Sequence, residues 1–293
     1  MVNLSEEQLV FYINGKWFPK NEAYISVEDF GWRSSITIFE GICIYGGAIF
    51  KLDEHLNRLQ RSAIIARIKI PPNQELKEIV KEFARKNKIK DGHFQLRISP
   101  GRGRSHKVES GPTITVFGYP RVSYENFKRN FRLKTTAVRD IPPECQDPRI
   151  KTGANYFNGH LARQEAQFSK CDDALTLDIR GFVSEATGSN IFVIKDNILR
   201  TPHKFFVLEG ITRNTIIDLA RNAGYKVFEE DMTLYDVYTA DEVFLCGSAF
   251  EVTPVVEVDG IKIGEGKCGP VTTKLQGLFK EYTLKPGPWR TEY

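Results

Sequence analysis

The stretch ITIFEGICIYGGAIFKL, residues 36–52, decides which kind of fold this chain can adopt. Apolar residues alternate through it on both sides of Gly46 and Gly47, which is the pattern of two β-strands joined by a tight turn. The residues that follow change to a helical period. One face of this predicted helix carries Leu52, Leu56, Leu59, Ala63 and Ala66. Strand, turn, strand and amphipathic helix in direct succession predict a mixed α/β fold, of the α+β kind.

Strand signals continue on both sides of this stretch. VFYINGKWF (residues 10–18) contains Asn14-Gly15, and this dipeptide between apolar runs predicts a β-hairpin with a type I′ turn. HFQLRIS (93–99) and TITVFGYP (113–120) alternate apolar and polar residues and predict two further strands. The proline and polar residues that come next favour a linker. We therefore expect an N-terminal α/β domain over residues 1–119, a linker over 120–126 and a C-terminal domain over 127–293.

The second half of the chain shows the same mixture of elements. Residues 173–202 and 241–260 contain apolar, β-branched runs interrupted by turn residues, which predicts several strands. Between them, GITRNTIIDLARNAG (210–224) has the period of an amphipathic helix that ends at Gly224. TTKLQGLFKEY (272–282) predicts a last helix.

The composition argues against several classes of protein. The 293 residues are 41% hydrophobic and 27% charged, and no apolar run approaches the roughly 18 residues that cross a bilayer. The formal net charge is +4, and the basic residues form no stripe interleaved with aromatic residues, so neither a membrane nor a nucleic acid is an expected partner. The N-terminal residues lack a basic segment followed by an apolar one, which predicts a cytoplasmic protein.

The cysteines give no sign of a disulfide framework or of a metal site. There are five, an odd number, without a CxxC pair or a Cys/His cluster. They are Cys43, Cys145, Cys171, Cys246 and Cys268. We expect them to be small buried side chains, and we expect no metal ion.

One lysine stands in an unusual context. Lys151 lies in DPRIKTGANYFNGHLARQEA (residues 147–166), where Pro, Gly and Asn predict a short turn and an amphipathic helix follows Tyr156. A lysine in such a turn is most often a surface residue. Its role therefore depends on what the rest of the chain offers.

Four features of the chain bear on this lysine. Glu185 ends a predicted strand directly before a Thr-Gly-Ser-Asn turn. LEGITRNT (208–215) predicts a helix N-terminus at Thr212 that could bind a phosphate, and Ser248 lies in a Gly-Ser-Ala turn. Arg58 lies beside the apolar stripe of its helix, where its guanidinium is available to bind an oxyanion.

Each of these features alone has an ordinary explanation, as a solvated turn residue, a capped helix or an exposed arginine. Together they supply what pyridoxal phosphate requires of a protein. These requirements are a lysine that forms an imine, a carboxylate for the protonated ring nitrogen, and donors for the phosphate.

Taken with their neighbours, these motifs resemble class IV (fold-type IV) pyridoxal-phosphate aminotransferases, the family of branched-chain aminotransferases, D-amino acid aminotransferases and aminodeoxychorismate lyases. The motifs are FEGI (39–42), HLNRL (55–59), KTGANY (151–156), SEATGSNIF (184–192), LEGITR (208–213) and GEGKCGPVT (264–272). The last of them resembles the branched-chain members most. The resemblance implies a homodimer whose subunits have a smaller N-terminal α/β domain and a larger, pseudo-barrel-like C-terminal domain, with the cofactor between them.

The resemblance also implies roles for individual residues. Lys151 would form the Schiff base and be the catalytic residue, Glu185 would pair with the pyridine nitrogen, and Tyr156 would donate to the ring's phenolic oxygen. The phosphate would be held by Arg58, Ile211, Thr212 and Ser248, and Asn190 would lie near the cofactor. Substrate would be bound by Phe39, Gly41, Arg97 and Ala249.

The implied activity is a transamination between a branched-chain or hydrophobic L-amino acid and a keto acid such as 2-oxoglutarate. Two positions depart from the branched-chain pattern, because Ser34 and Gln95 stand where those members usually carry tyrosines. A D-amino acid or (R)-amine transaminase therefore stays open, as does a lyase of the aminodeoxychorismate type. Arg102 and Arg104, in a glycine-containing loop, could form a second carboxylate site or be solvated charges.

Overall fold

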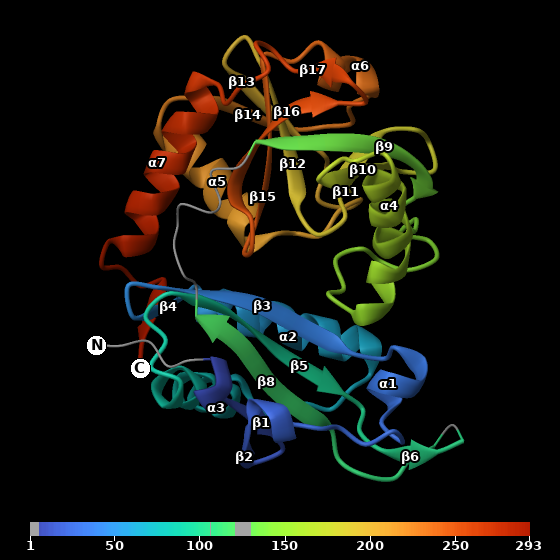
Figure 1. Ribbon diagram of the computed structural model, residues 1–293, viewed down its shortest axis with the longest axis vertical. Coiled ribbons are helices and arrows are strands. Elements are labelled where there is room, and N and C mark those ends of the chain that lie inside the picture. The colour runs from blue at the N-terminus through green and yellow to red at the C-terminus, as the bar shows by residue number, and fades with distance from the viewer. Residues whose placement is uncertain (1–5, 106, 121–129) are drawn as a thin grey trace. The chain divides into compact units, whose positions relative to one another are not determined.

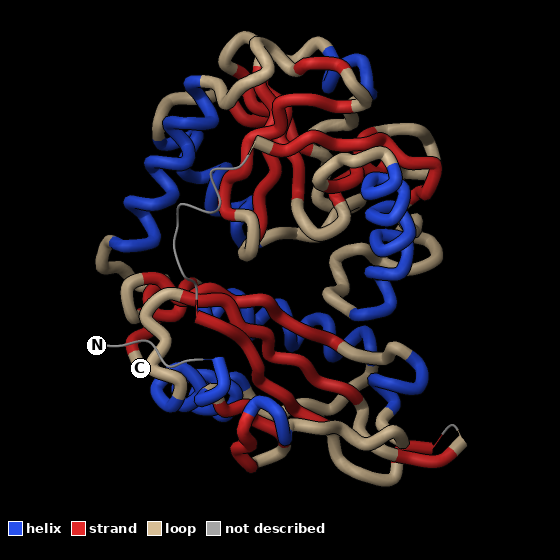
Figure 2. The backbone as a smooth tube through the Cα atoms, viewed as in Figure 1, coloured by secondary structure: helices blue, strands red, loops and turns tan. Residues whose placement is uncertain are grey.

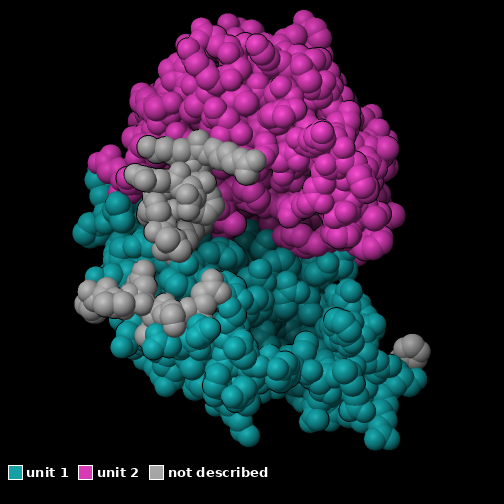
Figure 3. All heavy atoms as spheres, in the orientation of Figure 1, with its two compact units in different colours: residues 1–122, 150–154, 283–293 teal, residues 123–149, 155–282 magenta. Residues whose placement is uncertain are grey.

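A computed structural model describes residues 6–105, 107–120 and 130–293 of the chain (Figure 1). Helices and strands are mixed along it (Figure 2), so the predicted α/β class is confirmed. The chain divides into two compact units (Figure 3). Unit 1 comprises residues 1–122, 150–154 and 283–293, and unit 2 comprises residues 123–149 and 155–282. The predicted linker lies outside the described residues beyond Pro120, and it stays a prediction.

The helices and strands have the following bounds. The helices are α1 (Phe30–Ser34), α2 (Leu52–Ala66), α3 (Asn73–Lys86), α4 (Tyr156–Phe168), α5 (Ile211–Asn222), α6 (Leu234–Tyr238) and α7 (Pro270–Leu284), with short 3₁₀ turns η1 (Glu6–Gln8), η2 (Lys20–Glu22) and η4 (Gly153–Asn155). The strands up to residue 120 are β1 (Val10–Ile13), β2 (Lys16–Pro19), β3 (Ile38–Tyr45), β4 (Ala48–Phe50), β5 (Gly92–Ser99), β6 (Gly103–Arg104), β7 (Lys107–Val108) and β8 (Thr113–Pro120). The later strands are β9 (Phe131–Arg139), β10 (Asp173–Leu177), β11 (Val183–Ala186), β12 (Asn190–Lys195), β13 (Ile198–Thr201), β14 (Lys226–Glu229), β15 (Glu242–Gly247), β16 (Glu251–Val258), β17 (Ile261–Lys262) and β18 (Arg290–Glu292).

Unit 1 is built on a seven-stranded antiparallel sheet with the order β18-β4-β3-β5-β8-β1-β2. The predicted hairpin is present as β1 and β2, and Asn14 and Gly15 both have positive φ angles, of 47° and 85°. A type I′ turn requires this at both central residues, so the prediction from Asn-Gly is confirmed. The C-terminal strand β18 joins the same sheet beside β4, which explains why residues 283–293 belong to unit 1.

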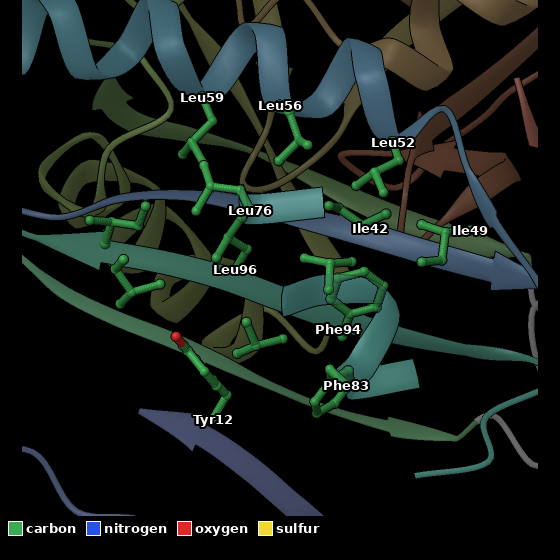
Figure 4. Close-up of a cluster of buried hydrophobic side chains, with 14 of the residues drawn as sticks. Tyr12, Ile42, Ile49, Leu52, Leu56, Leu59, Leu76, Phe83, Phe94 and Leu96 are labelled. Atoms are coloured by element: carbon green, nitrogen blue, oxygen red, sulfur yellow. The ribbon is translucent and has the colours of Figure 1, made fainter. Parts of the chain in front are cut away.

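The core of unit 1 forms where α2 and α3 pack against the sheet. Leu52, Leu56 and Leu59 point from α2 toward the strands, and Phe83 of α3 packs against Phe94 (Figure 4). The predicted stripe on α2 is thus confirmed, with Ala63 also buried and Ala66 partly buried at its end. Because side chains alternate along a strand, β3 sends its even-numbered residues toward these helices and its odd-numbered residues to the opposite face.

Unit 2 contains a nine-stranded sheet whose main path runs β11-β10-β9-β16-β15-β12-β13-β14, with β17 beside β16. The sheet curls (Figure 1), because the edge strand β11 is joined through residues 187–189 to β12, which lies further along the same sheet. Inward-facing residues such as Leu175, Val193 and Leu245 form a core inside this curl. The predicted pseudo-barrel-like C-terminal domain is therefore confirmed.

The prediction that all five cysteines are buried is wrong for three of them. Cys43 and Cys246 are buried in strands, whereas Cys171 and Cys268 are half-buried and Cys145 is exposed. Cys145 lies in a polar, proline-rich turn, where no strand or helix covers it. None of these five residues is in a disulfide, and no group of three or more metal-ligating side chains occurs within the described part of the chain. Nor, within that part, is any helix long and apolar enough to cross a bilayer.

The start of α7 is fixed by a buried carboxylate from β15. Glu242 accepts hydrogen bonds from the backbone N–H groups of Val271 and Thr272, at 2.9 and 2.8 Å, and is only 6% exposed. A Cβ at Gly269 would lie 2.1 Å from the Glu242 carboxyl carbon, so only glycine allows this approach. A negative group at a helix N-terminus is also favoured by the helix dipole.

Glu242→Gln is expected to lower the free energy of unfolding by about 1–3 kcal/mol, because an amide NH₂ would replace one of the two acceptor oxygens facing helix N–H groups. Urea denaturation of the cofactor-free protein measures this. The control is Glu265→Gln, which removes an exposed pair with Lys267 and should leave the unfolding midpoint unchanged. Equal effects of the two substitutions would contradict the capping role of Glu242.

Candidate active site

The backbone of Lys151 is fixed against strand β3. The Phe39 N–H donates to the Lys151 carbonyl at 3.0 Å, and the Gly153 N–H donates to the Thr37 carbonyl at 2.9 Å. The Lys151 N–H donates to the hydroxyl of Ser62 on α2, at 3.2 Å. The predicted turn-like stretch is present on both sides of Lys151, as a turn and bend at residues 148–150 and as η4 from Gly153, while the backbone between them pairs with the edge of β3. Movement of this lysine is confined to its side chain.

Lys151 and Arg97 share one aromatic neighbour. The Lys151 Nζ lies 4.7 Å from the centre of the Phe39 ring, and the Arg97 guanidinium carbon lies 4.5 Å from it. Phe39 and Arg97 are paired residues of β3 and β5, so their side chains lie on the same face of the sheet, opposite the helices. Arg97 donates to Thr37 Oγ1 and to Gln95 Oε1, both at 3.2 Å. This face of unit 1 thus presents two cationic side chains above an apolar ring.

Two residues, Ser34 and Gln95, depart from the branched-chain pattern, and only one of them lies on this face of the sheet. Gly41 is the next residue of β3 on the same face, and it pairs with Gln95. A Cβ at Gly41 would lie 2.8 Å from His93 Nε2, so His93 leaves little room for a side chain at this position. Ser34, by contrast, is exposed at the end of α1. Of the two departures, Gln95 is the one that contacts Arg97.

On the opposite face of β3, Glu40, His55 and Arg58 form a buried charged cluster. Arg58 donates to Glu40 through Nε (2.8 Å) and Nη2 (2.6 Å), and His55 Nδ1 lies 2.6 Å from Glu40 Oε2. All three residues are at most 5% exposed. The prediction that the Arg58 guanidinium is available beside the helix stripe is therefore wrong, because α2 covers an ionised strand carboxylate that a cation must balance.

The charges within this cluster can be assigned. Burial alone would raise the pKa of Glu40, but the Arg58 charge and the hydrogen bonds from Arg58 and His55 outweigh it and hold the pKa at about 2. Burial lowers the pKa of His55, and the positive charges of Arg58 and Lys151 act in the same direction against the Glu40 hydrogen bond. Glu40 is thus ionised and His55 neutral, with the proton on Nδ1 donated to Glu40.

Glu40 and His55 are functional-site candidates that our residue-by-residue assignment missed. Both lie in motifs already singled out, FEGI and HLNRL. The signal was available: Glu40 occupies an even-numbered position of β3 among isoleucines, where alternation directs its side chain toward the helices. An acidic residue at such a position needs a buried partner.

In unit 2, the carboxylate of Glu185 is held by an amide. Asn190 Nδ2 donates to Glu185 Oε2 at 2.8 Å and to the Leu208 carbonyl at 2.9 Å, which uses both of its hydrogens. A Cβ at Gly210 would lie 2.1 Å from Asn190 Oδ1, so this position of the LEGITR motif must be glycine. Glu185 therefore has a defined direction, set by residues from β11, β12 and the segment before α5.

Gly210 also precedes a helix start that is suited to an anion. Helix α5 begins at Ile211, one residue before the predicted start at Thr212, and its N-cap residue, Gly210, has no side chain that could cap the first turn. Ile211 and Thr212 are both buried. The N–H groups of a first helical turn, together with the helix dipole, form a phosphate-binding arrangement.

The remaining predicted site residues lie at the ends of elements in unit 2. Tyr156 is the first residue of α4 and is half-buried. Ser248 and Ala249 form the turn between β15 and β16, Ser248 half-buried and Ala249 exposed. Each is thus in a position from which a side chain or backbone group can reach a ligand.

The loop with Arg102 and Arg104 is a short hairpin of β6 and β7, and both arginines are exposed. The Arg102 N–H donates to Ser110 Oγ at 2.8 Å, and Arg33 Nη1 donates to the Gly103 carbonyl at 2.8 Å. The backbone beside these arginines is therefore tied down.

The donor set fits pyridoxal phosphate. The chain supplies an amine on an anchored backbone (Lys151), a carboxylate held in one direction (Glu185) and an uncapped helix start behind a glycine (Ile211 and Thr212). These groups match the aldehyde, the ring nitrogen and the phosphate of that cofactor. Glu40, which is engaged with Arg58, belongs to none of these three.

Comparison with known proteins gives a consistent picture. The family model for amino-transferase class IV matches residues 37–258. The branched-chain-amino-acid aminotransferase of Pseudomonas aeruginosa is 34% identical over 304 residues, which cover 99% of each protein. The solved branched-chain amino acid aminotransferase of T.th. with pyridoxamine 5'-phosphate is 33% identical, with a TM-score of 0.91, over 97% of this chain and 98% of that one. The branched-chain amino acid aminotransferase from Thermobaculum terrenum in its PLP-form is 30% identical, with a TM-score of 0.87, over 95% of each chain.

Glu40→Gln tests the buried cluster. It keeps the size of the side chain but leaves Arg58 buried without its counter-ion, so we expect the free energy of unfolding near pH 7 to fall by about 3–5 kcal/mol. The pKa of Glu40 is lowered from 4.5 to about 2. Its ionised form therefore contributes its full stabilisation above pH 4.5, and this stabilisation is lost as the pH falls from 4.5 toward 2. The difference in the free energy of unfolding between wild type and variant should therefore become smaller as the pH falls below about 4.5.

Urea titrations at a series of pH values measure this gap. Asp53→Asn is the control, since Asp53 lies on the same helix but forms an exposed pair with Lys77. It should change the stability little at any of these pH values. A Glu40→Gln gap that stays constant down to acid pH would argue against an ionised Glu40.

Proposed function

The chain belongs to the class IV aminotransferase family, and within it we propose an aminotransferase for branched-chain or other hydrophobic L-amino acids. It is an enzyme that transfers amino groups with pyridoxal phosphate as its cofactor. The observation that carries the substrate proposal is the arrangement of Lys151, Phe39 and Arg97 on one face of β3 and β5. The amine and the apolar ring suit the Cα–H and the side chain of such substrates, and the guanidinium suits the additional carboxylate of a dicarboxylic acceptor. The names of the similar proteins support the same class.

When bound, pyridoxal phosphate supplies an aldehyde that captures amines and a ring that accepts electrons from the substrate's Cα. Lys151 would hold the cofactor through Nζ. Its amine, when free, would act as the base that accepts the proton from the substrate's Cα. The fixed backbone of Lys151 keeps this transfer within the reach of one flexible side chain.

Glu185 keeps a proton on the ring nitrogen, because an ionised carboxylate beside that nitrogen favours its protonated form. Asn190 donates to Glu185 and to the Leu208 carbonyl, and it thereby holds Glu185 in the required direction. Tyr156 donates its phenolic hydrogen to the oxygen on the cofactor ring.

The phosphate would be bound by the first N–H groups of α5 at Ile211 and Thr212, by Ser248 and by Arg58. Glu40 binds Nε and Nη2 of Arg58, which fixes the direction of the guanidinium. Gly41 and Ala249 line the substrate's side chain together with Phe39.

In the second half of the reaction the proposed acceptor is 2-oxoglutarate, whose two carboxylates distinguish it from monocarboxylic keto acids. Arg97 is the residue proposed to bind the additional carboxylate. Gln95 favours a second candidate, a D-amino acid or (R)-amine transaminase. It accepts a hydrogen bond from Arg97 Nη2 and stands at a position where branched-chain members usually have a tyrosine.

We further propose that the enzyme acts as a homodimer. The segment 24–36 of unit 1 exposes several large apolar side chains, which is typical of a surface that binds another protein. They are Tyr24, Ile25, Val27, Trp32 and Ile36.

The donor is tested by a half-reaction. The purified enzyme with bound cofactor is mixed separately with L-leucine, D-alanine and (R)-1-phenylethylamine, and visible absorbance follows conversion of the cofactor to its pyridoxamine form. We expect fast conversion with L-leucine, and at least about a thousandfold slower conversion in Lys151→Ala. Glu185→Gln should convert slowly while still binding cofactor. Preferential conversion by D-alanine or the amine would replace the proposed substrate class with the second candidate, and release of pyruvate from aminodeoxychorismate would indicate a lyase.

The acceptor is tested by Arg97→Met. The ratio of KM for 2-oxoglutarate to KM for 4-methyl-2-oxopentanoate cancels the carboxylate that both acids share. We expect this ratio to rise about tenfold, because the additional carboxylate would lose its charged partner. Arg61→Met, at an exposed position of α2, serves as the control, and Arg102→Met examines the hairpin. An unchanged ratio in Arg97→Met, with a raised ratio in Arg102→Met, would transfer the role to the hairpin.

A further inference from the structure

The strand that carries Glu185 has an irregularity at that residue. In the pairing of β10 with β11, Leu175 lies opposite Ala186 and Leu177 lies opposite Val183. One residue of β10, Thr176, therefore faces two residues of β11, Ser184 and Glu185. This count defines a β-bulge, and such bulges change the direction of a side chain next to a functional site.

A buried hydroxyl binds the backbone of this bulge. Thr176 Oγ1 lies 2.7 Å from the carbonyl oxygen of Glu185, and Thr176 is only 1% exposed. The same Oγ1 lies 2.7 Å from Oδ2 of Asp140, the residue that follows β9. The Asp140 N–H donates to the Leu177 carbonyl at 3.1 Å, so the backbone on both sides of this contact is fixed.

Counting protons assigns the direction of these two hydrogen bonds. A threonine hydroxyl has one hydrogen, and a backbone carbonyl has none to give. Both short contacts are hydrogen bonds only if Asp140 carries a proton on Oδ2. The chain of donors then runs from Asp140 Oδ2–H to Thr176 Oγ1, and from the Thr176 O–H to the Glu185 carbonyl.

The surroundings of Asp140 agree with a protonated carboxyl. Burial raises its pKa, and the carboxylate of Asp178, in the turn after β10, acts in the same direction. A hydrogen bond from Ser184 on β11 opposes these effects without cancelling them. Thr176 would oppose them as well only if its hydroxyl donated to Asp140, which is the reverse of the direction that the proton count assigns. Arg180 is engaged with Asp178, through Nη2 at 2.7 Å. A neutral acid that donates a hydrogen bond is the form such an environment favours.

We propose that Asp140 and Thr176 are positioning residues for Glu185, in which a protonated Asp140 orients the Thr176 hydroxyl so that it holds the bulge carbonyl and thereby aims the carboxylate. This inference rests on the proposed role of Glu185 beside the ring nitrogen. Asn190 holds the Glu185 side chain from one end, and Thr176 holds its backbone from the other.

The proton on Asp140 can be observed without cofactor. In the infrared difference spectrum between the cofactor-free wild type and Asp140→Asn near neutral pH, we expect loss of the C=O stretch of a neutral carboxylic acid. Loss of ionised carboxylate bands instead would overturn the proposed donor chain.

The positioning role is tested by the affinity for two ligands, pyridoxal phosphate and its analogue with C–H in place of the ring nitrogen. Both bind through the same aldehyde and phosphate, so the ratio of their dissociation constants reports the contact with Glu185. Thr176→Val, which loses only the hydroxyl function, should reduce the preference for pyridoxal phosphate about five- to tenfold. Thr176→Ser and Asp140→Asn keep a donor at the same place and should retain the preference.

Glu185→Gln separates the two ways in which this test can fail. If it leaves the preference intact, then the proposed role of Glu185 itself is wrong. If it abolishes the preference while Thr176→Val and Thr176→Ser both behave like the wild type, then only the positioning role of Thr176 is wrong.

Discussion

The arrangement of unit 1 depends on the pairing of Lys151 and Gly153 with the first residues of β3. This pairing occupies the edge of β3 that β4, which pairs only with its far end, does not reach. It fixes the lysine backbone next to Phe39, and therefore on the face of the sheet where β5 presents Arg97. Lys151, although remote in sequence from these strands, therefore lies beside Phe39 and on the same face of the sheet as Arg97. No local preference of the lysine segment could produce this arrangement, because the hydrogen bonds come from the strand.

Strand β3 then divides its two faces between structure and chemistry. Its even-numbered residues pack under α2 and α3, and its odd-numbered residues face the other side. Glu40 is the exception on the packed face, where it is balanced by Arg58 and His55. An ion pair of this kind adds little to stability compared with apolar residues of the same size, but it fixes the direction of the guanidinium. We infer that the role of this cluster is to orient Arg58.

The periodic parts of the structure were predictable from the sequence, and the pairing partners were not. The stripe from Leu52 to Ala63 follows from a 3.6-residue period, and the hairpin at Asn14-Gly15 follows from the positive φ angles of its turn. Arg58 was misjudged because periodicity tells which face of a helix is apolar, but not that a carboxylate lies opposite it. The turns on both sides of Lys151 follow from Pro, Gly and Asn, but its pairing with β3 could not be predicted, because that strand lies far along the chain. The roles of Glu185 and Asn190 came from resemblance, and the hydrogen bond between them gives that resemblance a physical basis.

A carboxylate keeps a neighbouring group protonated only while it stays close to that group. Restraint of its position therefore matters more than the strength of its electric field. If Glu185 could rotate, it would exchange its ligand contact for water, and its influence on the ring nitrogen would fall with distance and with the higher dielectric. The structure restrains it at three points: Asn190 at one carboxylate oxygen, the Leu208 N–H at 3.5 Å from the other, and Thr176 at its backbone. These restraints come from three different segments of unit 2, so the curl of the sheet that brings β10, β11 and β12 together also sets the direction of the carboxylate. The bulge at Glu185 is consistent with this view, because regular pairing is interrupted at the residue of β11 whose side chain we propose to contact the cofactor.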